Sequence, residues 1–390
     1  MFPKAVRLVE IFGFQVKVDP SWFVIAALVV WTLSVGYFPD QVPGLGPGDY
    51  FILSVIAALA FFAGLILHEL AHSLVARRFG LGIGGITLFI FGGVAELDEE
   101  PVSPRSEFWI AVAGPAMSGA LASLAYLALR VLEVTGISAP LQAVVEYLAL
   151  VNFILAMFNL IPAFPLDGGR VLRAALWHFS GDLIRATQRA SVISSIFAYA
   201  LIAYGVVTLF SGGIISGLWL ALIGLFLLSA ARGTYQQLMV RSALSGKTVA
   251  ALFTNLVHTA RPEDTLAEIV DTIMLRYSVS FVPVIEGDHL LGYVDTCLLQ
   301  KIERENWTDT HVADIFVAAD ESNTVPPDLA TEDLMKRIAA GERRKFLVAA
   351  NGRFLGVITL ADLIAYIAVL QDLGPLRSSG AVGPKHQVRH

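Results

Sequence analysis

Charged residues are scarce in this chain: of its 390 residues only 15% are Asp, Glu, Lys or Arg, while 56% are hydrophobic. An ordinary soluble domain is about 45–50% apolar and about 25% charged, so the composition excludes both an ordinary soluble protein and a disordered chain. Residues 1–235 hold 26 of the charged side chains and residues 236–390 hold 34. The sequence therefore predicts a membrane domain over residues 1–235, followed by a soluble part.

Cysteine and excess positive charge are scarce as well. Cys297 is the only cysteine, which excludes disulfides and cysteine-rich metal sites. The net charge is −6, so we expect no nucleic-acid partner. We also expect no cleavable signal peptide, because the first apolar run lacks a small-residue cleavage site before Pro39.

Long apolar runs are what the first part contains. A helix needs about 20 apolar residues to span a bilayer, and six runs approach or exceed this length. They cover residues 22–38, 50–79, 107–132, 141–161, 191–210 and 214–231. We therefore predict a polytopic α-helical membrane protein with about six transmembrane helices, in contact with the lipid bilayer.

The distribution of Lys and Arg predicts the orientation of these helices. Basic residues precede the first run and follow the second, fourth and sixth, whereas residues 39–49, 132–140 and 211–213 carry none. Basic loops remain on the cytoplasmic side. We therefore expect a multi-pass protein of the cell membrane with cytoplasmic N- and C-termini.

One apolar stretch does not resemble a helix. Residues 81–95 combine β-branched residues with two glycine pairs, and the second pair is Gly92 and Gly93. Such glycine density disfavours a helix. We predict a membrane-embedded β-hairpin that enters from the cytoplasmic side, since irregular backbone at that depth survives only against protein or a wet cavity. The alternative is a loop on the surface.

The second apolar run contains the sequence His68-Glu69-Leu70-Ala71-His72. Helical residues four apart share a face, so both imidazoles can reach one metal ion, and Glu69 lies beside them. Each polar residue in a membrane helix costs a few kcal/mol, so three together need a reason. A purely structural polar cluster is the alternative.

Two histidines do not complete a zinc site, which requires three or four protein ligands. Asp167 is the candidate third ligand, at the end of the fourth run between prolines and glycines. In the predicted topology the second and fourth runs cross the membrane in the same direction. Asp167 and the histidines can then meet at one depth, near the cytoplasm. The alternative is an ordinary helix C-terminal turn.

Together, the HExxH motif and the segment from Asn159 to Gly168 resemble the site-2 protease family of intramembrane zinc metalloproteases. Phe91-Gly92-Gly93 is similar to the family's β-hairpin, and Ala113-Gly114-Pro115 is similar to its Gly-Pro motif. Ser118 stands where Asn is common, and Asp19 stands where His is common. The resemblance implies one Zn²⁺ per chain, held by His68, His72 and Asp167.

The expected reaction is the hydrolysis of peptide bonds within or near transmembrane segments. Zinc would activate a water molecule, and Glu69 would act as the general base. The resemblance implies that Asn159 positions the substrate or stabilises the oxyanion; a packing hydrogen bond is the alternative. An unwound substrate could add to the hairpin as a strand at Gly92 and Gly93. The resemblance implies that the substrate is a single-span membrane regulator, such as a membrane-held anti-sigma factor or a transcription factor precursor.

The soluble part contains an internal repeat. Residues 281–299 and 346–363 each read as strand, glycine turn, strand and helix start, after amphipathic helices at residues 266–275 and 331–339. This indicates two α/β units. They resemble a tandem cystathionine-β-synthase (CBS) domain pair over residues 245–370, on the cytoplasmic side. Residues 371–390 are predicted to form a flexible tail.

The resemblance implies that an adenine nucleotide can bind between the repeats. Thr359 and Asp362 match the residues that contact ribose and phosphate, whereas the first copy has Asp295 and Leu298 at these positions. At most one nucleotide site is therefore expected. The alternative is a structural module, or one that forms a homodimer.

A second function from another class is a CBS-regulated ion channel or transporter, because intramembrane charges can mark ion paths. The HExxH motif together with Asp167 favours the protease. Zinc content and the Glu69→Gln variant would distinguish the two.

Overall fold

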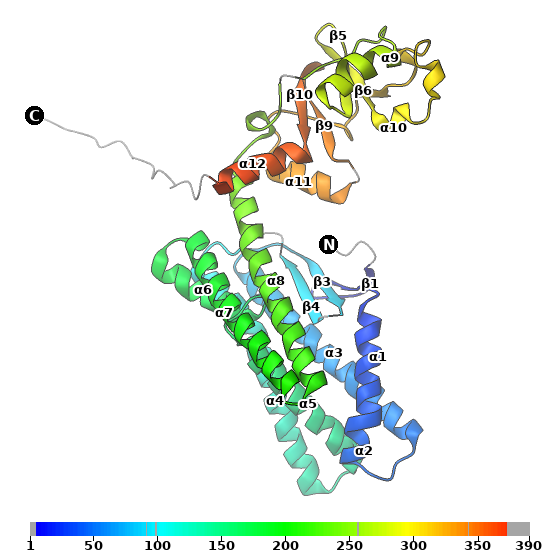
Figure 1. The fold of residues 1–390 in the computed structure, drawn as a ribbon. Helices are drawn as coiled ribbons and strands as arrows, with labels where there is room; N and C mark the ends of the chain where they lie inside the picture. The colour runs from blue at the N-terminus through cyan, green and yellow to red at the C-terminus, as the bar shows by residue number, and fades with distance from the viewer. Residues whose placement is uncertain (1–4, 91, 98–99, 256, 342, 373–390) are drawn as a thin grey trace, which may run out of the picture. The chain divides into compact units, whose positions relative to one another are not determined.

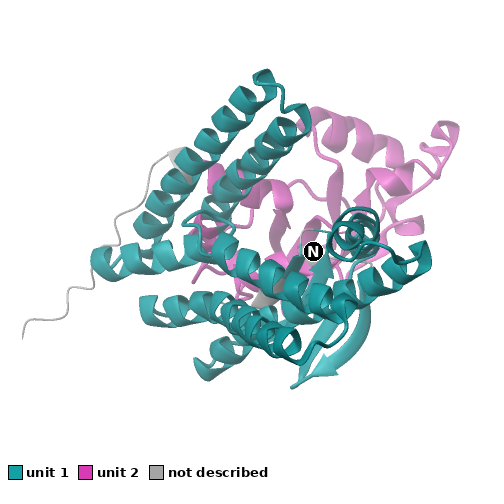
Figure 2. Cartoon of the chain, turned by 90° about the horizontal axis from the view of Figure 1, so that it is seen from below, with its two compact units in different colours: residues 1–237 teal, residues 238–390 magenta. Residues whose placement is uncertain are grey.

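The computed structural model describes residues 5–90, 92–97, 100–255, 257–341 and 343–372. The chain divides into two compact units, residues 1–237 and 238–390, which are coloured separately in Figure 2. The domain limits expected from sequence, at residues 235, 245 and 370, stay predictions. Beyond residue 372 the predicted tail lies outside the described residues.

Six helical runs in the described part of the chain are long and apolar enough to cross a membrane, as predicted. The first is made of α1 (Trp22–Thr32), η1 (Leu33–Tyr37) and α2 (Phe38–Gln41). The others are α3 (Pro47–Arg78), α4 (Pro104–Thr135), α5 (Ala139–Asn159), α7 (Leu183–Phe210) and α8 (Ile214–Leu244). Large apolar side chains such as Leu59, Leu127 and Ile196 lie exposed on their outer faces. The buried faces instead carry many small or polar residues, which is the pattern of helices packed within a bilayer.

Helix α6 (Asp167–Ser180) was not predicted. Its 14 residues are too few to span a bilayer, and its polar and apolar residues lie on opposite faces. Leu172 and Leu176 pack against a small cluster of Phe164, Ala190 and Ala231, so the apolar face is covered by α7 and α8. The helix ends at Gly181, whose left-handed backbone conformation is typical of a helix C-terminus.

The glycine-rich segment forms two antiparallel strands, β3 (Ile83–Phe89) and β4 (Gly92–Leu97). They are part of a four-stranded sheet in the order β1-β2-β3-β4, because the N-terminal strands β1 (Val6–Ile11) and β2 (Phe14–Val18) extend it. These N-terminal strands were not predicted. Buried side chains of β2 and β3 pack against α3, and thereby place the sheet beside the helix that carries the HExxH motif (Figure 1).

The second unit has the predicted repeat. Its strands are β5 (Phe281–Glu286), β6 (His289–Asp295), β7 (Val317–Ala318), β8 (Thr324–Val325), β9 (Lys345–Ala350) and β10 (Arg353–Thr359). Its helices are η2 (Val249–Ala251), α9 (Leu266–Ile269), η3 (Val270–Leu275), α10 (Thr296–Leu299), η4 (Arg304–Asn306), η5 (Val312–Asp314), α11 (Thr331–Ala340) and α12 (Leu360–Asp372). The sheet order β5-β6-β10-β9-β8 brings the second strands of both repeats together.

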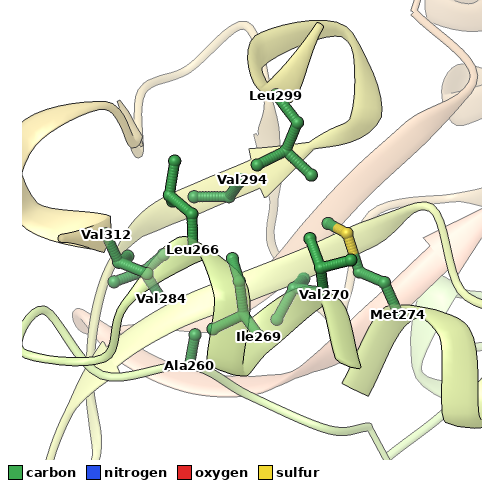
Figure 3. Packing of buried hydrophobic residues seen from close by; sticks show 10 residues of the cluster. Ala260, Leu266, Ile269, Val270, Met274, Val284, Val294, Leu299 and Val312 are labelled. Carbon is green, nitrogen blue, oxygen red and sulfur yellow. The ribbon is translucent and has the colours of Figure 1, made fainter. Parts of the chain in front are cut away.

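Each repeat has its own hydrophobic core. In the first, Leu266, Ile269 and Val270 of the leading helix pack onto the β5–β6 hairpin (Figure 3). In the second, Leu334 of α11 and Leu363 of α12 pack against β9 and β10. In both cores apolar helix faces pack on the apolar face of a strand pair, which is why a similar apolar pattern occurs twice in the sequence.

Candidate functional site

Three potential metal ligands meet in the first unit. His68 and His72 lie one turn apart on α3 and are 3% and 6% exposed. Oδ2 of Asp167 lies 3.2 Å from Nε2 of His68 and 3.1 Å from Nε2 of His72, and the two Nε2 atoms are 3.2 Å apart. The structure therefore brings together the three residues that the sequence singled out.

The local setting of Asp167 differs from the prediction. It does not lie at the end of the fourth apolar run, because α5 stops at Asn159 and a seven-residue connection intervenes. Asp167 is the first residue of α6. The alternative of a helix C-terminal turn is wrong for the same reason. A carboxylate in the first turn of a helix is stabilised by the helix dipole, so α6 favours the ionised form that a metal requires.

Neighbouring groups on α4 orient both imidazoles. Nδ1 of His72 donates to the backbone oxygen of Ile110 at 2.6 Å, and Nδ1 of His68 lies 2.8 Å from Oγ of Ser118. A carbonyl oxygen can only accept, so Nδ1 of a neutral His72 carries the proton and its Nε2 keeps a lone pair. Hydrogen bonding on the far nitrogen is how proteins usually fix metal-binding histidines.

This donor set fits a zinc ion. With its Nδ1 protonated, Nε2 of His72 is an acceptor, and it faces the carboxylate oxygen of Asp167, which is also an acceptor. Acceptors facing one another repel unless a cation lies between them. Tetrahedral zinc ligands at about 2.1 Å from the metal lie about 3.4 Å apart, a little more than the observed separations.

Gly114 provides the space for this arrangement. A Cβ atom built on Gly114 would clash with Nε2 of His72 and Nε2 of His68. Gly114, Ile110 and Ser118 lie on one buried face of α4, so this face supports both imidazoles. The sequence showed Gly114 and Ser118 only as family positions. Their spacing of four residues on an apolar helix was the available signal.

The side chain of Glu69 extends from α3 toward the β-hairpin. A Cβ atom on Gly93 of β4 would come within 2.7 Å of Cγ and 3.2 Å of Oε1 of Glu69. The Glu69 side chain therefore packs directly on the backbone of β4. Glu69 belongs to the same segment of α3 as the two histidines. Gly92, by contrast, has open space beside it and a positive φ of 128°.

None of the described hydrogen bonds links Asn159 to His68, His72 or Asp167. Its amide nitrogen donates to the backbone oxygen of Leu155, one turn earlier in α5, at 3.1 Å. This is the packing bond that was the alternative reading of this residue. A different amide, that of Asn152, is buried on α5 and lies close to Gly64 of α3.

The second unit contains a cavity of about 680 Å³, and both Thr359 and Asp362 line it. Oδ2 of Asp362 accepts from the backbone nitrogen and from Oγ1 of Thr359, each at 2.8 Å, and thus caps the start of α12. Arg344 and Lys345 also line the cavity. In the first repeat, Asp295 instead caps the four-residue helix α10 through the backbone nitrogen of Leu298 at 3.0 Å.

Six apolar helices around two histidines and a carboxylate define a metallohydrolase of the membrane-embedded class. The profile of Peptidase family M50 matches residues 56–144 and 134–203, and that of the CBS domain matches residues 249–296 and 312–369.

Known proteins extend this similarity over the whole chain. A Mycobacterium tuberculosis protein named zinc metalloprotease Rip3 is 35% identical over 95% of both chains. A Synechocystis protein named zinc metalloprotease sll0528 is 32% identical over 92% of this chain and 94% of its own. The solved Site-2 Protease from Methanocaldococcus jannaschii is 27% identical, covers 59% of this chain and 94% of its own, and has a TM-score of 0.40. The chain therefore belongs to peptidase family M50, the site-2 protease family of zinc metalloproteases, in the form that carries a CBS pair.

Proposed function

We propose that this protein cleaves peptide bonds within or near transmembrane segments of membrane-bound regulatory proteins, using one zinc ion held by His68, His72 and Asp167. The observation that carries the proposal is the meeting of three potential metal-ligand atoms, within 3.2 Å of one another, in a helical membrane unit. Single-span regulators, such as anti-sigma factors or transcription factor precursors, are the expected substrates.

Zinc at this site would lower the pKa of a bound water molecule and polarise the scissile carbonyl. Glu69 is the residue that accepts the proton of the attacking water and returns it to the leaving amine. Its contact with Gly93 holds the carboxylate on the side of the ligands that faces the hairpin. The hydrogen bonds at Nδ1, from His72 to Ile110 and between His68 and Ser118, orient both rings so that their Nε2 atoms point to Asp167.

The substrate binds as an added strand on β4, with Gly92 and Gly93 at the contact. β4 is the last strand of its sheet within the described residues, so its outer edge offers the backbone groups that an extended peptide requires. A strand added there would lie beside Glu69 and the ligands. Asn159, at the end of α5, contacts the substrate only if its bond to Leu155 opens.

The experiment that tests this function compares the wild type with Glu69→Gln in the purified, full-length protein. We expect one zinc per chain in both and cleavage of a single-span membrane substrate only by the wild type. Glu133→Gln is the matched control, because Glu133 is paired with Arg130 on an exposed face of α4. Absence of zinc, with an ion flux that survives Glu69→Gln, would instead identify a channel or transporter.

A second experiment tests the substrate strand. Replacing Gly92 with valine adds a side chain to β4 without touching Glu69, so substrate binding and cleavage should fall while the zinc content stays at one per chain. Gly93 is left unchanged because a side chain there would displace Glu69. Full cleavage by Gly92→Val would argue against β4 as the substrate-binding edge.

We further propose that the cavity of the CBS pair binds one adenine nucleotide. Support comes from the N-terminus of α12, which attracts phosphate, and from the cations Arg344 and Lys345 beside it. Apolar residues such as Val257, Val279 and Phe281 provide a wall for the base. Bound nucleotide would then regulate the protease.

Titration of the full-length protein with ATP and with AMP tests this site. A ligand at 100 times its Kd stabilises the folded unit by about 2.7 kcal/mol, which is measurable as a rise in Tm. Asp362→Ala should abolish the rise. Asp295→Ala, which removes a similar helix cap in the first repeat, should not. If neither nucleotide changes Tm, the CBS pair has a structural or homodimer-forming role instead.

A further inference from the structure

A buried ion pair joins α4 to α6 beside the candidate metal centre. Nε of Arg173 on α6 donates to Oε1 of Glu107 on α4 at 2.6 Å, and a second guanidinium nitrogen of Arg173 contacts the same oxygen. Glu107 is fully buried and Arg173 is only 4% exposed. Arg173 also reaches Oε2 of Glu100, at 3.2 Å, in the segment that connects β4 to α4.

This pair is poorly explained by stability alone. Removing two charges from water costs free energy that their attraction repays only when the geometry is good, and apolar residues of similar volume often serve as well. Moreover, Oε2 of Glu107 has no hydrogen-bond partner among the described residues. Stability alone therefore does not account for a buried pair with an unsatisfied oxygen.

The position of the Glu107–Arg173 pair indicates its role. Glu107 lies on the same buried face of α4 as Ile110, Gly114 and Ser118, one turn before Ile110. Arg173 lies six residues after Asp167 in the same helix. The pair therefore connects the face that supports both imidazoles to the helix that begins with the third ligand.

We propose that Glu107 and Arg173 are positioning residues that set the place of Asp167 relative to His68 and His72. This inference rests on the proposed metal centre. A ligand shifted by about 1 Å no longer matches the geometry that zinc requires. Helix α6 is short and does not span the membrane, and a seven-residue connection separates it from α5. Two guanidinium nitrogens in the middle of α6 contact one carboxylate oxygen on α4, and this buried contact opposes a sliding motion of α6 that would displace Asp167.

The test measures zinc affinity by competition with a chelator, together with Tm, in the full-length protein. Because a single substitution would leave an unpaired buried charge, the main variant is Glu107→Leu combined with Arg173→Met, which replaces the pair by apolar side chains. We expect zinc affinity to fall about 10–100-fold, as for other residues that orient metal ligands, while Tm of the zinc-free protein changes little. Arg173→Lys keeps the charge but not the fork, and should give an intermediate loss.

Arg130→Gln is the matched control, since it breaks an exposed ion pair on α4 that lies outside the site, and it should keep wild-type zinc affinity. Wild-type affinity in the double variant would overturn the proposal. So would a loss of affinity that merely follows a large fall in Tm, or a double variant that does not fold while Arg173→Lys binds zinc normally. Failure of the wild type to bind zinc would refute the metal centre itself, a result distinguishable from all of these.

Discussion

Gly114 determines how closely α4 approaches the two imidazoles. A side chain at this position would occupy the space of both Nε2 atoms, which are the atoms that face Asp167. The helix interior disfavours glycine by about 0.5–1 kcal/mol relative to alanine, so its presence here is explained by the close approach.

We predict that Gly114→Ala abolishes zinc binding and cleavage. The added methyl group must displace His68, His72 or α4 itself, and each displacement separates the ligands. Zinc content of the purified variant is the measurement. Gly119→Ala, in the same helix but with open space around its Cβ, should bind zinc normally and be equally or more stable. Normal zinc content in Gly114→Ala would show that the ligands lie elsewhere.

The hydrogen bond of Ser118 to His68 can be tested separately from the packing of the Ser118 side chain. Its hydroxyl is the partner of Nδ1 of His68 and is fully buried. We predict that Ser118→Ala weakens zinc affinity about 10–100-fold, because His68 loses the hydrogen bond that orients its ring. Chelator competition measures this loss.

Ser123→Ala is the control for Ser118→Ala, because the Ser123 hydroxyl bonds only its own helix, at the oxygen of Gly119. Ser118→Asn should restore part of the affinity if the amide oxygen accepts from His68. Equal affinity in Ser118→Ala and the wild type would assign Ser118 to packing alone.

At the scale of elements, the hairpin and α3 act as one unit. Gly93 touches Glu69, while β2 and β3 pack on the same helix. The edge of β4 and the proposed general base, Glu69, are therefore held in a fixed relative position by protein contacts that do not involve the metal.

We predict that Gly93→Ala lowers kcat by at least tenfold while zinc remains bound. The new Cβ would lie 2.7 Å from Cγ of Glu69, so the carboxylate must move, and a small displacement of a catalytic group has a large effect on rate. Cleavage rates at saturating substrate, with zinc content, test this. Gly36→Ala, which meets no neighbour within 4 Å, is the control. An unchanged kcat would contradict the role of the contact.

The elements that sequence could predict are those with a local pattern. Six apolar runs and a duplicated strand–turn–strand unit are visible in hydropathy alone, and both are present. Helix α6 was not predicted, because its residues follow a proline- and glycine-rich connection whose composition is typical of a loop. Strand β2 was not predicted because it pairs with β3, about 70 residues away in the sequence. Strand β1 pairs only with its neighbour β2, across a short turn at Phe12 and Gly13, and this local hairpin was missed.

Sequence predicted the candidate site only where its residues follow a local pattern. His68 and His72 are found from their spacing and Asp167 from topology, since each lies in a short recognisable motif. The bond from His72 to Ile110 uses a backbone oxygen, which any residue type provides, so no letter in the sequence marks it. The Glu107–Arg173 pair spans 66 residues, and each member alone resembles an ordinary charge at a helix end.

At the scale of the whole molecule, Cys297 offers a test of orientation. It is the only cysteine of the chain, it is exposed, and it lies in the CBS pair. If this region is cytoplasmic, a membrane-impermeant thiol reagent should label Cys297 only after intact cells are permeabilised. Cys297→Ser is the control for labelling specificity. Labelling of intact cells would place the CBS pair outside and reverse the predicted orientation of all six helices.

The separation of the ligands along the chain has a consequence for biosynthesis. His72 and Asp167 are 95 residues apart, and α4 and α5 lie between them. At about 5–20 residues per second, a ribosome needs roughly 5–20 s to proceed from the second ligand to the third. During that interval the nascent chain holds two histidines and Glu69 but not the complete zinc site. A complete zinc site can therefore form only after the first four apolar helical runs and the start of α6 have been synthesised.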